Sequence, residues 1–284
     1  MRYIAARTLD DAVAAVAAGA VPLAGGTDLL VSWEHRAHPD AVCDLQRVPG
    51  LRGVEERGDR IWIGALTTHA DLGRAPLLLA AAPLLREAAL SIGAVQVRTR
   101  GTVGGNVANA SPAGDVLTAL YALDAEVELR GPTGARARPI AAFVLGPRRT
   151  ALAAGEILTG VTFPRPGPEL QGYEKLGLRA AQAIAVVSLA VRLRLDGGVV
   201  REAALALGSV APTPVRAPAA EVALCGRQLD GAAVRAAAAA LSATATPIDD
   251  VRASAEYRRA MAGALLLRFL ERAGLPVGSP SARA

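Results

Sequence analysis

The chain has 284 residues, 52% of them hydrophobic, so it can bury a sizeable core and form two domains. Its net charge of +5 does not indicate a nucleic-acid-binding protein, because the arginines are scattered and only two Trp, four Tyr and three Phe could stack on bases. No apolar run approaches membrane-spanning length, and Asp10 and Asp11 interrupt the segment where a signal peptide would be apolar, so we expect a cytoplasmic protein without a membrane span.

The first part of the chain alternates short apolar segments with helical ones. Thr8-x-x-Asp11 predicts a capping box for a helix that ends at Gly19. Residues 76–92 predict a helix, with a possible kink at Pro83. Other helices are predicted after Asp28, after Thr67 or Thr68, and over the run VLTALYAL. The predicted strands are 2–5, 21–23, 41–45, 51–54, 60–64, 125–130, 135–138 and 156–163.

A proline- and glycine-rich segment then divides the chain. We place a domain boundary here, between a domain of residues 1–166, itself divided near residue 55, and a domain of residues 167–274. Strands are predicted over 171–178, 183–195 and 199–208, and helices over 217–224, 230–242 and 254–271. The second domain is therefore expected to be a three-stranded antiparallel sheet backed by helices, with a disordered tail over 275–284.

The segment AGGTD, residues 24–28, joins a predicted strand to a predicted helix. Exposed backbone N–H groups at the turn and the positive end of the helix dipole would make an anion site there without a basic side chain. The segment is neither GxGxxG nor GxxxxGK[ST], so it supports neither a Rossmann nor a Walker A site. Many such turns contain Gly-Gly simply to turn, and that alternative stays open.

Residues 96–128 form a second glycine-rich stretch, QVRTRGTVGGNVANASPAGDVLTALYALDAEVE. Its glycines and small side chains would let a ligand approach the backbone closely. Thr102, Asn106, Asn109 and Ser111 offer short polar side chains, and Asp115 adds one carboxylate. A carboxylate among neutral donors suits sugar or polyol hydroxyls better than phosphate.

Cysteine and lysine usage adds two constraints. Cys43 and Cys225 are far apart without a CxxC pair, so the chain cannot by itself hold an iron–sulfur cluster, and we expect two buried thiols. Lys175 is the only lysine among 31 basic residues. Either its compact ammonium is required where a guanidinium would not fit, or it is a surface lysine kept by chance.

Three segments in order carry a family resemblance: PLAGGTDLL, IGAVQVRTRGTVGGNVANASPAGD and YEKLGLRAAQAIAVVSLAV. Together they closely resemble the FAD-binding medium subunits of molybdenum hydroxylases, the family of xanthine dehydrogenase and aerobic carbon monoxide dehydrogenase. The resemblance covers nearly the whole chain. It implies an α+β fold in which a two-lobed FAD-binding domain of the PCMH type precedes a smaller α/β domain.

The resemblance also implies a set of FAD-binding residues. Residues 24–28 would hold the pyrophosphate through backbone N–H groups, residues 102–106 would form a second phosphate and ribityl-facing loop, and Asp115 would take cofactor hydroxyls. The full implied set is Leu23, Ala24, Gly25, Gly26, Thr27, Asp28, Ile92, Gly93, Thr102, Val103, Gly104, Gly105, Asn106, Ser111, Asp115, Leu158 and Lys175.

Four of these residues are implied to lie near the rings of the cofactor. Leu158 would pack near the flavin or the adenine, and the Lys175 ammonium would lie by the isoalloxazine, where it would favour the electron-rich reduced flavin. Ile92 and Gly93 would pass the ring. Some family members place an aromatic residue there, so aliphatic packing is expected instead of stacking.

The function that the resemblance implies is electron transfer, with no catalytic residue for the organic substrate and no metal ligand in this chain. Electrons would come from a molybdenum cofactor in a large subunit through [2Fe–2S] clusters in a small subunit, and would leave for NAD⁺ or another acceptor. A dimer of heterotrimers is implied. The segments APTPVRA and GPRRTALAAGE favour the xanthine dehydrogenase type over the carbon monoxide dehydrogenase type.

Two other functions stay open. A stand-alone flavin oxidase or reductase of the same fold would need its own acid or base, and His35, His38 and His69, the only histidines, form no convincing constellation. A scaffold subunit that has lost its flavin would give a colourless protein that stays without FAD when FAD is added.

Overall fold

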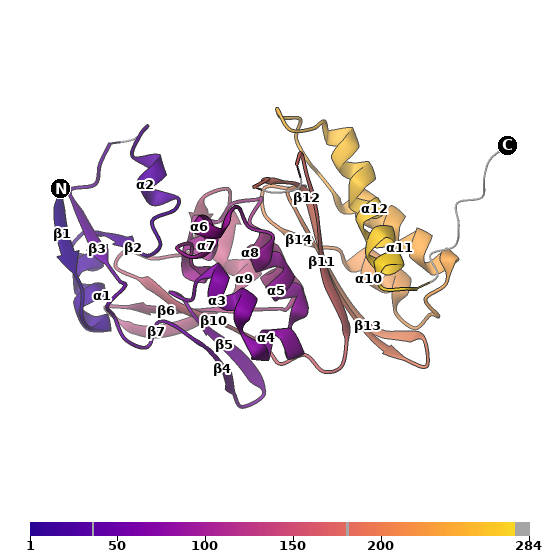
Figure 1. The fold of residues 1–284 in the computed structure, drawn as a ribbon, viewed down its shortest axis with the longest axis horizontal. Helices are drawn as coiled ribbons and strands as arrows, with labels where there is room; N and C mark the ends of the chain where they lie inside the picture. The colour runs from indigo at the N-terminus through magenta and orange to yellow at the C-terminus, as the bar shows by residue number, and fades with distance from the viewer. Residues whose placement is uncertain (36, 180–181, 276–284) are drawn as a thin grey trace.

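Three packed units lie in a row along the long axis of the molecule, with the N-terminal unit at one end and the C-terminal helices at the other (Figure 1). This computed structural model describes residues 1–35, 37–179 and 182–275. Each unit has a hydrophobic cluster of its own. Within the described ranges, no helix is both long enough and apolar enough to cross a bilayer.

The first unit is a parallel three-stranded sheet in the order β1-β3-β2. The predicted capping box is confirmed, since Thr8 Oγ1 accepts from the Asp11 amide at 3.0 Å and Asp11 Oδ2 accepts from the Thr8 amide at 3.1 Å. The helix expected after Asp28 is only one turn long, and no side chain caps its start. The elements are β1 (Arg2–Ala5), α1 (Leu9–Ala17), β2 (Val21–Leu23), α2 (Leu29–Ser32) and β3 (Ala41–Asp44).

The second unit is an antiparallel five-stranded sheet in the order β4-β5-β10-β6-β7, with helices gathered between it and the third unit (Figure 1). A two-stranded hairpin, β8-β9, accompanies it. The elements are β4 (Val54–Arg57), β5 (Arg60–Gly64), α3 (His69–Arg74), α4 (Pro76–Ala81), α5 (Pro83–Leu90), α6 (Val95–Arg98), α7 (Val103–Asn109), α8 (Asp115–Ala122), β6 (Glu126–Gly131), β7 (Gly134–Pro139), α9 (Ile140–Phe143), β8 (Val144–Gly146), β9 (Arg149–Thr150) and β10 (Ile157–Pro164).

Two sequence predictions in this unit are wrong in detail. The strand predicted over 51–54 begins only at Val54, because Gly53 has φ +129° and turns the chain just before it. The helix predicted over 76–92 ends at Leu90, and at Pro83, where a kink was expected, it is broken in two. Proline lacks an N–H and disfavours helical backbone in the preceding residue, and Ala82 has φ −140° and ψ 58°.

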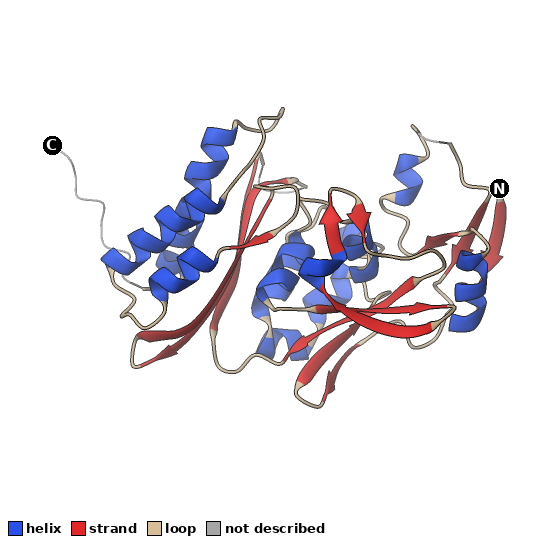
Figure 2. Ribbon diagram, turned by 180° about the vertical axis from the view of Figure 1, so that it is seen from behind, coloured by secondary structure: helices blue, strands red, loops and turns tan. Residues whose placement is uncertain are grey.

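The third unit is an antiparallel sheet in the order β11-β12-β13-β14, so the expected three strands are joined by a fourth. The missed strand is two residues long and lies in a proline-rich connection, which hid its pattern. Figure 2 shows helices α10–α12 on one face of this sheet. The elements are β11 (Leu170–Gly177), β12 (Ala185–Asp196), β13 (Val199–Gly208), β14 (Val215–Arg216), α10 (Pro218–Leu224), α11 (Gly231–Thr244) and α12 (Ala255–Arg272).

The other face of this sheet packs on the second unit, through contacts of α5 with β11 and of α8 with β12 and β13. Two helices of one unit thus complete the core of the next. The domain boundary expected at residue 166 lies in the connection between β10 and β11 and stays a prediction. Beyond Leu275, the expected tail lies outside the described residues.

Candidate functional site

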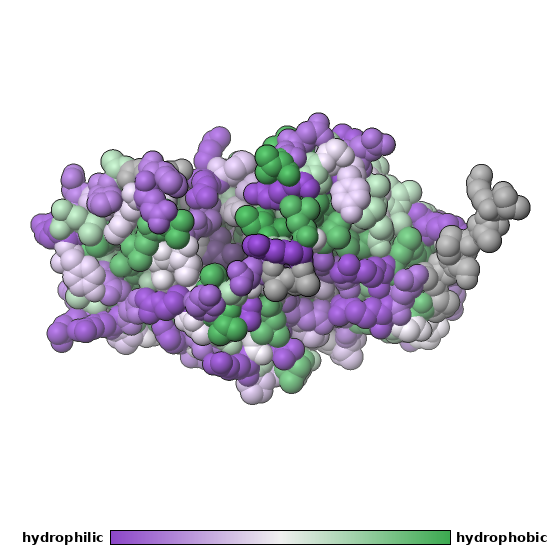
Figure 3. Space-filling view, turned by 45° about the horizontal axis from the view of Figure 1, so that its top comes forward, coloured by the Kyte–Doolittle hydropathy of each residue, from purple (hydrophilic) through white to green (hydrophobic). Residues whose placement is uncertain are grey.

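A cavity of about 540 Å³ lies between the first and second units. This first cavity is bounded by the β2–α2 connection on one side and by the α6–α7 segment on the other. In Figure 3 the surface is hollowed between the N-terminal unit, at the left, and the centre of the molecule. Its volume is within the range of about 300–1,000 Å³ that ligand sites have. The lining residues are Pro22, Ala24, Gly25, Gly26, Thr27, Asp28, Leu29, Ser32, His69, Ile92, Val97, Gly101, Thr102, Gly105, Asn106, Ala108, Asn109 and Arg148.

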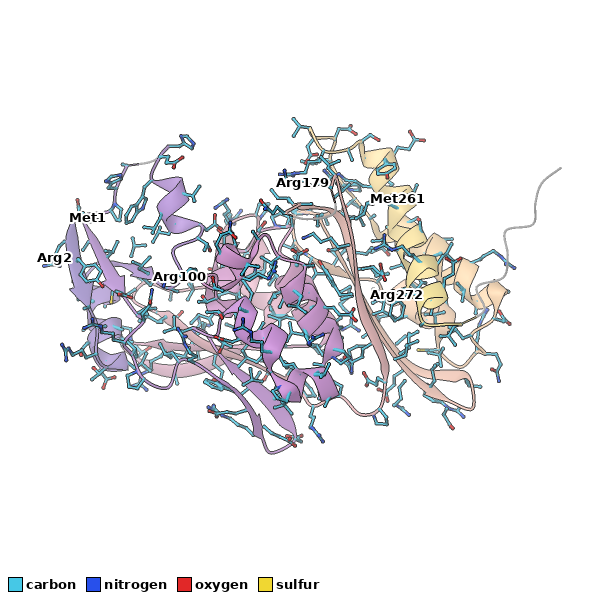
Figure 4. The ribbon with its side chains drawn as sticks, in the orientation of Figure 1. Met1, Arg2, Arg100, Arg179, Met261 and Arg272 are labelled. Atoms are coloured by element: carbon cyan, nitrogen blue, oxygen red, sulfur yellow. The ribbon has the colours of Figure 1, made fainter. Side chains whose placement is uncertain are left out.

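The two glycine-rich segments meet at the floor of this cavity. A Cβ atom on Gly25 would lie 1.9 Å from the carbonyl oxygen of Arg100 and 3.1 Å from Cα of Gly101. Figure 4 shows Arg100 between the N-terminal unit and the helices of the second unit. Only a residue without Cβ allows this approach, so Gly25 is what lets two segments that are distant in sequence form one site.

The backbone of the β2–α2 connection is free to bind a ligand. Within the described part of the chain, the amides of Gly25, Gly26, Thr27 and Asp28 donate no hydrogen bond. Gly26 has φ +74°, a backbone conformation that favours glycine, and it lines the cavity. Because α2 has only four residues, its dipole adds little, and the turn amides themselves make the anion site.

The second segment differs from its prediction, because residues 103–109 form helix α7 instead of a loop. All four amides at its start are used within the protein: Val103 N–H donates to Thr67 O, Gly104 N–H to Ala65 O, and the Gly105 and Asn106 amides to Thr102. These amides are therefore not free to bind a ligand, and cofactor binding by residues 102–106 stays a prediction for their side chains. A Cβ on Gly104 would lie 2.7 Å from Ala65 Cβ, so this glycine serves close packing.

Helix α7 lines the cavity with the side chains of one of its faces. Thr102, Asn106 and Asn109 lie along this face at helical spacing, and Gly105 leaves the wall between them flat. Asn106 Oδ1 accepts from the Leu117 amide at 3.2 Å, which leaves the Asn106 amide nitrogen as a donor. This wall can therefore bind hydroxyl or carbonyl groups of a ligand.

His69 contributes an uncharged imidazole to the same cavity. His69 is 3% exposed, and this burial lowers the pKa of His69 to about 4. Its Nδ1 atom finds no hydrogen-bond partner among the described residues. At neutral pH this histidine adds no charge to the cavity lining.

A second cavity of about 720 Å³ opens between the second and third units. Lys175 lines it, and Lys175 Nζ donates to Asp115 Oδ2 at 2.8 Å and to the carbonyl of Ser91 at 3.1 Å. Tyr173 donates to Asp115 Oδ1 at 2.6 Å. Burial raises the pKa of the Asp115 carboxyl, an effect that Lys175 opposes. The only lysine of the chain is thus the largely buried partner of a buried carboxylate between two units, which excludes the chance-surface explanation.

The structure brings most of the predicted set to these two cavities. Nine of the predicted residues line the first cavity: Ala24, Gly25, Gly26, Thr27, Asp28, Ile92, Thr102, Gly105 and Asn106. Gly93 and Lys175 line the second. Leu23, Val103, Gly104, Ser111, Asp115 and Leu158 line neither. Both Asp115 oxygens accept from protein donors, so its contact with cofactor hydroxyls stays a prediction.

Several lining residues were missed. Asn109 was named among the polar side chains of the second glycine-rich stretch but is absent from the implied set, although it continues the face of α7 that Thr102 begins. Arg148 comes from the β8–β9 loop, which no local pattern links to the cavity. The remaining missed residues are Pro22, Leu29, Ser32, His69, Val97, Gly101 and Ala108. Of the two thiols, Cys43 is buried as expected, whereas Cys225, at the C-terminal end of α10, is exposed.

Comparison with known proteins identifies the family. Residues 1–166 match the family described as FAD binding domain in molybdopterin dehydrogenase, and residues 172–273 match the CO dehydrogenase flavoprotein C-terminal domain. The carbon monoxide dehydrogenase medium chain of Afipia carboxidovorans is 38% identical over 277 residues, covering 95% of this chain and 96% of that protein. The xanthine dehydrogenase FAD-binding subunit of Escherichia coli O157:H7 is 34% identical over 264 residues, covering 90% of each.

The fold agrees with this result. A solved structure of the carbon monoxide dehydrogenase from Hydrogenophaga pseudoflava, described as lacking the Mo-pyranopterin moiety of the molybdenum cofactor, superposes with a TM-score of 0.91 at 39% identity, over 95% of this chain and 96% of that one. The predicted resemblance and fold class are confirmed. The chain belongs to the family of FAD-binding medium subunits of molybdenum hydroxylases, the flavoprotein components of carbon monoxide and xanthine dehydrogenase-type oxidoreductases.

Proposed function

We propose that this chain carries FAD across its two cavities and transfers electrons through it. In this proposal the chain accepts electrons from [2Fe–2S] clusters of a small partner subunit, which receive them from a molybdenum cofactor in a large subunit, and passes them to NAD⁺ or another acceptor. A dimer of heterotrimers in the cytoplasm belongs to the same proposal. The observation that carries it is the set of unused amides at residues 25–28, which faces a polar helix wall across a ligand-sized cavity.

The residues present fit FAD in kind. The turn amides of Gly25 to Asp28 would hold the pyrophosphate, and the Thr102, Asn106 and Asn109 side chains would bind polar groups of the chain between the rings. Ile92 lines the first cavity and its neighbour Gly93 lines the second, so the two cavities meet at this dipeptide.

Lys175 would act on the flavin end of the site. When bound, FAD supplies redox chemistry in one- and two-electron steps. The Lys175 ammonium is held by Asp115 and by the Ser91 carbonyl, so it is fixed in place at the wall of the second cavity. A fixed cation favours the form of a neighbouring group that carries more negative charge, and would therefore raise the potential at which electrons are accepted.

The type of complex is a separate part of the proposal. The Afipia carboxidovorans carbon monoxide dehydrogenase chain is more similar to this one than the Escherichia coli xanthine dehydrogenase subunit, at 38% against 34% identity. This supports the carbon monoxide dehydrogenase type, although the segments singled out in the sequence favour the xanthine type. We expect the organic or gaseous substrate to be selected in the large subunit.

The experiment that tests the proposal is purification of the chain with its partner subunits, followed by metal analysis and a substrate panel. The expected result is a yellow-brown complex that contains FAD, molybdenum and iron, and whose flavin is reduced when a substrate is added. A chain that purifies alone and oxidises an organic substrate steadily would instead support a stand-alone oxidase. A colourless chain that takes up no FAD would support a scaffold.

A further inference from the structure

Arg148 reaches the first cavity from a strained loop. It lies with Pro147 in the two-residue connection between β8 and β9 and has φ +56°. Glycine or asparagine normally supplies this left-handed backbone, because a longer side chain is disfavoured there. Such strain persists where the surroundings fix it, and it is frequent at ligand sites.

The surroundings hold the Arg148 side chain toward the cavity. Its backbone amide donates to Ala110 O at 3.1 Å, and its guanidinium Nη1 donates to Asn109 Oδ1 at 3.0 Å. Nη2 lies 3.9 Å from Asp28 Oδ1, on the opposite side of the cavity. The guanidinium therefore spans from the end of α7 to the turn that carries the unused amides, and half of the side chain remains exposed.

The charges around the cavity single out this residue. Among the described residues that line it, Arg148 is the only Arg or Lys, Asp28 is the only carboxylate, and His69 is uncharged at neutral pH. The turn amides offer partial positive charge but no full charge. A pyrophosphate on those amides would need a cation nearby, and the planar guanidinium matches phosphate oxygens with two parallel hydrogen bonds.

We propose that Arg148 is a cofactor-binding residue that contacts the pyrophosphate of FAD opposite the Gly25–Asp28 turn, and that Asn109 positions it. This inference rests on the proposed function. On binding, the guanidinium exchanges its weak contact with Asp28 for the phosphate oxygens, while Asn109 keeps hold of Nη1.

The test is FAD titration of the full chain, followed by the fluorescence of the flavin. Arg148→Gln should weaken FAD binding about 10- to 100-fold, the range for a lost charge-assisted hydrogen bond. Added salt should weaken binding less in Arg148→Gln than in the wild-type protein, because one attraction that salt screens is gone. The matched control is Arg149→Gln, since Arg149 is the exposed neighbour in β9 and does not line the cavity.

Arg148→Gly separates binding from folding. Glycine adopts φ +56° without strain, so this variant should keep or raise the melting temperature while it weakens FAD binding as Arg148→Gln does. If both Arg148 variants bind FAD as tightly as Arg149→Gln, or with an unchanged salt dependence, the inference is overturned and the proposed function stands. A wild-type chain that takes up no FAD overturns the proposed function, and this inference with it.

Discussion

Gly25→Ala should separate the two segments that form the first cavity. The added Cβ would lie 1.9 Å from the Arg100 carbonyl oxygen, whereas ordinary contacts begin at 3.4 Å. Both partners are backbone atoms, so no side chain can rotate away to relieve the clash. Overpacking of this kind costs about 1–3 kcal/mol. The free chain can relieve this strain by opening the cavity, but the strain returns when the cavity closes on FAD. Because 1.4 kcal/mol corresponds to a tenfold change in affinity, the Kd for FAD should increase about 5- to 140-fold.

The assay is FAD titration of Gly25→Ala beside Gly167→Ala, with urea denaturation of both. Gly167 has no atom within 4 Å of its would-be Cβ and no positive φ, so its substitution should leave FAD affinity and stability unchanged. Relative to the wild-type chain, Gly25→Ala should lose more free energy of FAD binding than free energy of unfolding, because the strain is greatest when the site is closed. Equal FAD affinity in the two variants would refute the reasoning that the Gly25–Arg100 contact builds the site.

Three further predictions concern Lys175, His69 and the two cysteines. Lys175→Met should lower the unfolding free energy, measured by urea denaturation, by about 3–5 kcal/mol, because it leaves the buried Asp115 carboxylate without its cation. A loss below about 1 kcal/mol, the value for an exposed ion pair, would contradict this prediction. Burial lowers the pKa of His69 to about 4 in the folded chain. Between pH 6.5 and 4 the His69 imidazole is therefore protonated in the unfolded chain more readily than in the folded chain, so the stability of the fold decreases as the pH falls through this window. His69→Gln should therefore remove about 2 kcal/mol of the stability lost between pH 7 and pH 5, and equal losses in both proteins would count against it. A thiol reagent should label one cysteine in the native chain, the exposed Cys225, and Cys43 only after unfolding; labelling of both in the native state would show that Cys43 is accessible.

The local elements and the family could be read from the sequence. The capping box at Thr8 and the glycine turn after β2 depend only on residues a few positions away, so the sequence alone predicts them. The same holds for the β6–β7 hairpin and the three long strands of the third unit. These elements repeat their side-chain pattern over enough residues to fix their type.

The tertiary structure decided what each glycine and each charge does. Gly25 and Gly104 look alike in sequence, yet the first lies against Arg100 in the site and the second packs on Ala65. The amides of Val103 and Gly104 donate to Thr67 and Ala65 in the loop before α3, and no local sequence pattern predicts these contacts. The position of Arg148 depends on its contacts with Asp28 and Asn109, and that of Lys175 on its contact with Asp115. All three partners lie tens of residues away in the sequence. Hydrogen bonds and ion pairs depend on distance in space, and only the packing of the three units sets those distances.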